Sequence, residues 1–343
     1  MKRIFALVLL FVLAFSLLVL SGCTTDIPTK QSDVVKSFPK DSAPSRMVKT
    51  NAQWVRLNST YGSRNYTISV GEDLDSADAV YNVADVTIWY FEANDKAIVW
   101  CEKSEDLNTF KIYTFENRLV ETVSQVSTQA GFQPQNIGVF LDVAYYCVID
   151  YDQQMVRILA YDMQTKETTD FYTVAFSETQ QPYSIYVDNG KLCFMCSDQV
   201  KVFDLQNKAV VFESALPTDT KHVFAASYDS ANDTCALYYA DGDSEDIGFL
   251  KEGDTTISSV FTFAENHYAY QDKLECDNGH IYWIDQANVS GMIADHYKLV
   301  DYNYLEHKVV ETPRAFDFCR YDGAIYTLSF NKKGEYTHID LGR

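Results

Sequence analysis

One pattern of strand-forming residues recurs through the chain at a nearly constant interval. Six short runs are rich in Val, Ile, Tyr, Phe and Trp, as β-strands are: Lys96–Trp100, Ala144–Val148, Lys191–Met195, Thr234–Tyr238, His280–Ile284 and Ala324–Leu328. Equivalent residues, from Ile98 in the first run to Ile325 in the last, lie 47, 47, 44, 45 and 44 residues apart. From Trp54 onward there is almost no helical periodicity, so the repeat predicts an all-β fold.

The turns between the strands repeat as well. Asn189-Gly190, Asn278-Gly279 and Asp322-Gly323 precede three of the runs, and such pairs supply the positive φ angles of two-residue hairpins. A second turn follows the next strand at Tyr161–Lys166 and Phe203–Lys208. Each unit is therefore a meander of four antiparallel strands, A to D. Because one meander cannot bury both faces, the units are predicted to form the blades of a β-propeller.

The number of blades follows from how the period is counted. Six units are predicted, and seven is the alternative because Gln53–Val55 lies one period before Ile98. The last unit ends after its third strand, Glu335–Leu341. We therefore expect an N-terminal strand to complete that blade and close the ring. Three segments are candidates for this strand: Trp54–Asn58, Tyr66–Val70 and Ala79–Val83.

The N-terminus has the features of an export signal. Two basic residues precede the 17-residue apolar run Ile4–Leu20, and the sequence Leu-Ser-Gly-Cys follows at Leu20–Cys23. This motif resembles the lipobox of bacterial lipoproteins. The resemblance implies that residues 1–22 are a signal peptide and that Cys23 is acylated, in the manner of palmitate-bearing anchors. It also implies a location on the cell membrane, in the lipid bilayer through Cys23, facing outside the cytoplasm. A spanning helix is the alternative.

The rest of the chain divides into two parts. Residues 23–50 contain three prolines and no apolar periodicity, so we expect a lipidated N-terminus and a flexible tether. Residues 51–343 are expected to form a single β-propeller domain. Its strand period and its aromatic-Asp-x-x-Asn/Thr-Lys turn resemble those of the TolB-like six-bladed propellers of bacterial envelope lipoproteins. The resemblance covers roughly residues 54–343 and implies a fold, but no functional residue is carried over with it.

Charge and cysteine content exclude some classes of function. The chain has 28 Lys and Arg against 48 Asp and Glu, which gives a net charge of −20 and argues against a nucleic-acid partner. Seven cysteines follow Cys23, at 101, 147, 193, 196, 235, 276 and 319. An odd number spread so widely is unlike a disulfide framework, and buried thiols are expected. One or two disulfides, or metal or redox use of Cys193 and Cys196, are the alternatives.

Acidic residues gather where the B–C loops are predicted. Five successive loops carry them, and the candidates for a ligand face are Asp150, Asp152, Asp198, Asp241, Asp243, Glu245, Asp246 and Asp285. Because these loops share one rim of a propeller, their fields would add there and favour cationic ligands. The alternative is that they are ordinary turn residues of an acidic protein.

No catalytic arrangement is evident in the sequence. The six histidines lie in no recognisable motif and the Gly-x-Ser-x-Gly elbow is absent. No cofactor is predicted, although calcium is an alternative at Asp241–Asp246, where acids alternate imperfectly. The sequence favours a non-enzymatic module that binds an unidentified protein, peptide or glycan. The alternatives are a propeller enzyme acting on extracellular glycan or peptide, and a structural partner in an envelope complex.

Overall fold

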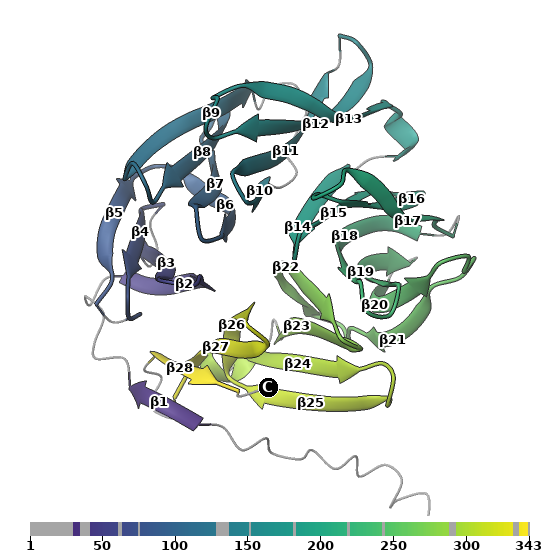
Figure 1. Cartoon of the computed structure of the whole chain (residues 1–343). Coiled ribbons are helices and arrows are strands. Elements are labelled where there is room, and N and C mark those ends of the chain that lie inside the picture. The colour runs from purple at the N-terminus through teal and green to yellow at the C-terminus, as the bar shows by residue number, and fades with distance from the viewer. Residues whose placement is uncertain are drawn as a thin grey trace, which may run out of the picture.

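The described residues of the chain fold into seven four-stranded antiparallel sheets arranged in a ring (Figure 1). The computed structural model describes residues 30–34, 42–60, 64–74, 76–127, 137–150, 152–180, 183–217, 220–241, 244–287, 293–331 and 336–341. Over these ranges the only helical segments are the short 3-10 turns η2 (Glu178–Gln180) and η3 (Ile293–His296). None of the described helices is long and apolar enough to cross a membrane. The apolar run Ile4–Leu20 and the lipobox lie outside the described residues.

Each sheet is one blade, with its strands in chain order apart from the last. Blade one comprises β2 (Ser42–Lys49), β3 (Trp54–Thr60), β4 (Tyr66–Gly71) and β5 (Asp78–Val83). Blade two comprises β6 (Thr87–Ala93), β7 (Ala97–Lys103), β8 (Leu107–Thr114) and β9 (Leu119–Ser127). Blade three comprises β10 (Ile137–Phe140), β11 (Val143–Asp150), β12 (Met155–Asp162) and β13 (Thr168–Ala175). Blade four comprises β14 (Ser184–Asp188), β15 (Lys191–Cys196), β16 (Gln199–Asp204) and β17 (Ala209–Ala215).

The remaining three blades complete the ring. Blade five comprises β18 (Thr220–Asp229), β19 (Thr234–Asp241), β20 (Ser244–Lys251) and β21 (Ser258–Thr262). Blade six comprises β22 (His267–Asp277), β23 (His280–Ala287), β24 (Tyr297–Asn303) and β25 (Lys308–Pro313). Blade seven comprises β26 (Ala315–Tyr321), β27 (Ala324–Phe330), β28 (Tyr336–Asp340) and, as its outer strand, β1 (Lys30–Val34).

The first strand of each blade lies nearest the centre of the ring (Figure 1). Apolar side chains from the faces of neighbouring blades pack together, as in the cluster that joins Val202 of blade four to Leu237 of blade five. The core is therefore divided into layers between blades, and the largest buried side chains include Trp100 and Trp283. This packing leaves the innermost strands free to direct other side chains toward the axis.

The predicted turns are present. Asn189-Gly190, Asn278-Gly279 and Asp322-Gly323 have positive φ at both residues, as type I′ hairpins require. In the C–D turns a side-chain oxygen binds the backbone of the turn: Asp162 Oδ1 accepts from the amides of Gln164 and Thr165, at 2.8 and 2.9 Å. The repeated turn sequence is thus a local hydrogen-bonding device.

The described ring has seven blades, which was the alternative prediction, and not the six that were expected. The six repeated units correspond to blades two to seven, and blade one lies at the position predicted one period earlier. It was the least recognisable unit because Arg56 stands in its second strand, where the other units have apolar or aromatic residues. This side chain is buried at 7% exposure and donates from Nη1 to the carbonyl of Leu74 at 2.6 Å.

An N-terminal strand does complete the last blade, but it is not one of the three predicted candidates. Those segments lie in β3, β4 and β5 of blade one. The closing strand is β1, which pairs with β28 in the register Lys30 with Asp340 and Gln31 with Ile339. The propeller therefore begins before residue 51, and β1 and β2 lie in the segment predicted to be a tether. Pro44 lies within β2, an edge strand of blade one, where a proline is tolerated.

Candidate functional site: the central channel

Charged side chains line the centre of the ring. On β22, Lys273, Glu275 and Asp277 alternate along the strand, so they share one face. Between Ala269 and Leu274 the pairing of β22 with β23 shifts, and this bulge lies directly before the charged triplet. Bulges re-aim side chains and are common beside functional sites.

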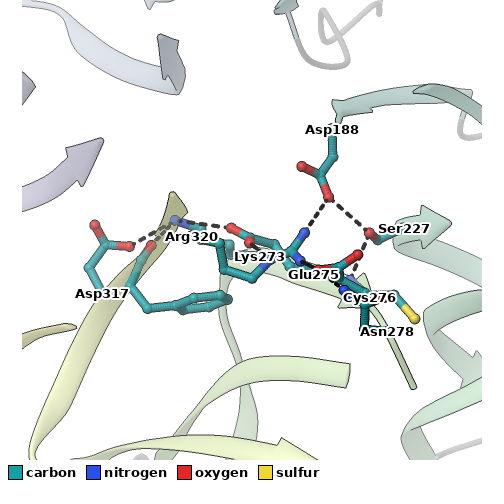
Figure 2. A network of polar contacts seen from close by, with 10 residues as sticks. Asp188, Ser227, Lys273, Glu275, Cys276, Asn278, Asp317 and Arg320 are labelled. Atoms are coloured by element: carbon teal, nitrogen blue, oxygen red, sulfur yellow. Dashed lines mark hydrogen bonds and ion pairs between the residues drawn. The ribbon is translucent and has the colours of Figure 1, made fainter. Parts of the chain in front are cut away.

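Arg320 of β26 is held by carboxylates from two other blades (Figure 2). Its Nε donates to Glu275 Oε2 at 2.6 Å, its Nη2 to Asp188 Oδ2 at 3.0 Å, and its Nη1 pairs with Asp277 Oδ2 at 2.8 Å. Because Asp188 belongs to blade four and Arg320 to blade seven, one ion pair spans the centre of the ring. The guanidinium therefore ties innermost strands together across the channel.

Lys273 forms a second set of contacts next to this one. Its Nζ lies 3.3 Å from Asp317 Oδ1 and 3.8 Å from Glu275 Oε1, and it also donates to the carbonyl of Phe318. The other carboxylate oxygen of Asp317 accepts from the amide of Met47 in blade one, at 2.7 Å. Lys273 and Asp317 thus connect blades six, seven and one.

A hydroxyl extends the network to blade five. Ser227 Oγ lies 3.4 Å from Asp188 Oδ2 and accepts from the amide of Cys276 at 2.9 Å (Figure 2). Blades four, five, six and seven therefore share one continuous set of polar contacts around the axis. Such a network is costly to break because each buried partner would lose its compensation.

The carboxylates of the channel have altered acidity. Burial raises the pKa of Asp188 to about 6, although Arg320 opposes the shift. Burial also raises the pKa of Asp317, against the effect of Lys273. Burial disfavours the charged forms of Lys273 and Arg320, but the surrounding carboxylates outweigh it and raise the pKa of both. Both cations therefore stay charged.

The channel widens into a cavity of about 520 Å³ at the face of the A–B hairpins. Blades one to four, six and seven contribute to its lining, and blade five does not. Val139, Phe140, Leu141 and Val187 form apolar wall, whereas Lys96 lies at the hairpin between β6 and β7. The cavity has the size of small-molecule sites in proteins, and its lining combines this apolar wall with many polar and charged side chains.

Glu92 of β6 lies at the inner end of the cavity. It lines the cavity together with Tyr186 and Lys273, and the same three residues line a void of about 30 Å³ that also contacts Arg46. Two residues earlier, Tyr90 is an extra bulged residue with φ of 46°. Burial raises the pKa of Glu92 to about 7, and the neighbouring carboxylates of Glu275 and Asp188 add to this effect.

The predicted acidic face lies at the opposite rim, and its residues differ in exposure and in hydrogen-bond partners. Asp150 ends β11 and accepts from the amide of Gln153 at 2.9 Å, and Asp152 is exposed in the turn. Asp198 is exposed and accepts from Gln180 Nε2 at 2.6 Å. Asp241 ends β19 and is exposed, and its carbonyl accepts from Ser244. These acids therefore sit in turns, where they cap neighbouring groups.

The other predicted candidates face other groups of the same blade. Asp246 is 5% exposed and accepts from Ser244 Oγ at 2.7 Å, from Ser259 Oγ at 3.3 Å and from Thr262 Oγ1. Glu245 accepts from the hydroxyl of Tyr238. Asp243 lies outside the described residues.

Asp285, the last predicted candidate, is the deepest of them. It is 2% exposed, and its carboxylate lies 3.0 Å from His267 Nδ1 and 3.3 Å from Lys298 Nζ. A separate cavity of about 260 Å³ on blade six is lined by these residues together with His296 and Arg314. Of the predicted acidic candidates that the structure describes, Asp285 alone lines this second cavity.

The described ranges contain seven thiols and several side chains of the kinds that bind metals. These ranges hold no group of three or more His, Cys, Asp or Glu residues arranged to bind a metal ion. The seven cysteines after Cys23 are all free and buried, in agreement with the expectation of buried thiols. Burial raises the pKa of Cys147 to about 12, so this thiol is held in its unreactive form.

Sequence reasoning missed the channel residues. The one local signal was the alternation of Lys273, Glu275 and Asp277 in a strand that also carries the apolar Leu274, because charges on one face of a buried strand need an interior polar site. The partnership between Asp188 and Arg320 had no such signal, because 132 residues separate them.

Comparisons with known proteins reveal relatives only at the level of fold. No protein-family model matches the chain, and no curated protein does. Among solved structures, the β-propeller domain of the Trilobed protease from Pyrococcus furiosus is similar with a TM-score of 0.57 and 10% identity, over 90% of this chain and 95% of that one. Kuenenia stuttgartiensis hydrazine synthase gives a TM-score of 0.55 and 11% identity, over 92% and 98%. A prolyl endopeptidase gives 0.60 and 10%, over 90% of this chain and 47% of that one. These likenesses support the propeller fold alone.

Proposed function

We propose that this protein is a lipid-anchored, extracytoplasmic binding module whose propeller receives a small ligand in the central cavity. The cavity of about 520 Å³ carries this proposal, because six blades contribute to it and ionised side chains from separate strands meet at its inner end. Binding sites in ring-shaped folds are built where separate elements converge. The likeness to peptidase propellers is one of fold, so it does not favour the enzymatic alternative.

The anchor rests on the sequence. Leu20–Cys23 follows an apolar run of the length and position that lipoprotein signals have. Two acyl chains on Cys23 would hold the protein firmly, because each buried CH₂ contributes about 0.8 kcal/mol. In the native host, we expect Cys23→Ser to abolish incorporation of a labelled fatty acid. A Cys23→Ser protein that stays labelled and detergent-soluble would disprove the anchor.

Binding in the cavity can be tested apart from the anchor. A set of small solutes that spans amino acids, polyamines, dicarboxylates, sugars and nucleosides is screened by thermal shift against the protein without residues 1–23. At least one class should raise the melting temperature of this protein but not of Ala93→Phe or Lys96→Trp, which place bulk in the lining. Stabilisation by no class, or equal stabilisation of the blocked variants, would refute the cavity as the site.

A further inference from the structure

The channel and its cavity carry charges of both signs. Their described side chains include six carboxylates and five cations. The carboxylates are Glu92, Asp95, Asp188, Glu275, Asp277 and Asp317, and the cations are Arg46, Lys49, Lys96, Lys273 and Arg320. Because the two signs nearly balance, net charge selects no ligand. A carboxylate without a partner would attract a cation, because the attraction between charges strengthens where water is scarce.

Five of the six carboxylates already have partners. Asp188, Glu275 and Asp277 bind Arg320, Asp317 binds Lys273 and the backbone of blade one, and Asp95 accepts from Asn51. Three carboxylates thus compensate the charge of the Arg320 guanidinium, so we assign it no anionic ligand.

Glu92 is the exception. No hydrogen bond or ion pair joins its carboxylate to any other described residue. The side chain is half-buried and lines both the cavity and the void beside it. The positive charges of Lys273 and Arg46 act on Glu92, but no ion pair within 4 Å joins either cation to its carboxylate. The ammonium of Lys273 is engaged by Asp317 and by the carbonyl of Phe318. Glu92 is therefore a half-buried carboxylate without an ion-pair partner among the described residues.

The walls around Glu92 suit an organic cation. Tyr186 lies beside it, and Val139, Phe140 and Val187 provide apolar surface along the cavity. A divalent metal ion would need several free oxygen ligands, and no group of three His, Cys, Asp or Glu residues in the described ranges is arranged for one. A protonated amine needs fewer partners, and its carbon chain gains from apolar contact.

We propose that the central cavity binds a small organic amine, whose ammonium group pairs with Glu92 and whose carbon skeleton lies against Tyr186, Phe140 and Val139. This inference rests on the proposed function, because it assigns a ligand class to the same cavity. Lys273 stays with Asp317, and Arg320 remains the structural centre of the channel. The amine thus occupies the position of the carboxylate that, among the described channel residues, has no partner.

The test uses 1,5-diaminopentane as the probe, with pentane-1,5-diol and glutarate as neutral and anionic controls of the same length. Isothermal titration calorimetry at pH 8 should give one site for the diamine and none for either control. Glu92→Gln should weaken the affinity at least tenfold, whereas Asp152→Asn, an exposed acid on the opposite rim, should leave it unchanged. Retained folding of Glu92→Gln is checked by its melting temperature.

The outcomes separate the two proposals. Diamine binding that is equal in Glu92→Gln, or that is lost in Asp152→Asn instead, would overturn the assignment to Glu92. Binding of the diol or glutarate, blocked by Ala93→Phe, would overturn the amine but retain the cavity as a site. Absence of binding for all three probes overturns the inference, and the wider solute screen then decides the proposed function.

Discussion

Replacing Glu92 by Gln should stabilise the protein, and the gain should grow with pH. Burial and the nearby carboxylates of Glu275 and Asp188 raise the pKa of Glu92 from 4.5 to about 7, against the opposing effect of Lys273 and Arg46. A carboxyl whose pKa is raised by folding favours the native state below its unfolded pKa. That contribution is lost as the pH rises through the folded value. The window therefore runs from about pH 4.5 to about pH 7.

The magnitude follows from this shift. One pKa unit corresponds to 1.36 kcal/mol, so ionisation of Glu92 costs roughly 3 kcal/mol of folding free energy at pH 8 and about 1 kcal/mol at pH 5. Gln keeps the shape of the side chain and removes the charge. With roughly 2 °C of melting temperature per kcal/mol in a domain of this size, Glu92→Gln should melt about 6 °C above the parent protein at pH 8 and about 2 °C above it at pH 5.

The measurement is a pair of calorimetric melts at each pH. Glu116→Gln, the same chemical change at an exposed turn position, serves as the control and should change the melting temperature by less than about 1 °C. Equal melting temperatures of Glu92→Gln and the parent at pH 8 would refute the reasoning. Such a result would mean that the carboxylate has a partner or enough water within the channel.

Two further changes address the ring itself. Arg320→Met should destabilise the protein by about 3 to 5 kcal/mol in urea unfolding followed by tryptophan fluorescence, because three carboxylates lose their shared cation. Arg320→Lys should lose less, and equal losses would argue against the role of charge. Deleting residues 24–36 removes β1 and should lower the melting temperature by about 5 °C, because roughly three pairs of backbone contacts with β28 are lost. Deleting residues 24–29 should have no effect, and equal effects of both deletions would contradict closure by β1.

Most of the architecture could be predicted from the sequence, because each blade has local sequence signals for its strands and turns. The turn pairs at Asn189-Gly190 and Asn278-Gly279 need positive φ whatever the tertiary context, and the strands between them have a clear pattern. The closure of the ring by β1 could not be predicted from such local signals. An edge strand pairs along one side only, so Lys30–Val34 needs little apolar patterning to be accepted by β28.

The acidic rim shows why positions near strand ends are hard to assign. Asp246 and Asp285 were predicted at loop tips, but β20 begins at Ser244 and β23 continues to Ala287. Both acids therefore lie within strands, where alternation decides which face a side chain takes, and both are buried. A shift of one residue in the expected strand end changes an exposed charge into a buried one.

The stability and the proposed binding of this protein depend on the same carboxylate in opposite ways. An ionised Glu92 without an ion-pair contact costs folding free energy above pH 7, and an amine that binds only the native state offsets part of that cost by mass action. Glu92→Gln would therefore be both the more stable protein and the weaker binder, as is common where function needs an unsatisfied group. Amine affinity should also fall below pH 7, because a protonated Glu92 no longer attracts a cation. Channel residues such as Arg320, whose charge is already compensated, carry no such conflict, which is why we assign structure to Arg320 and recognition to Glu92.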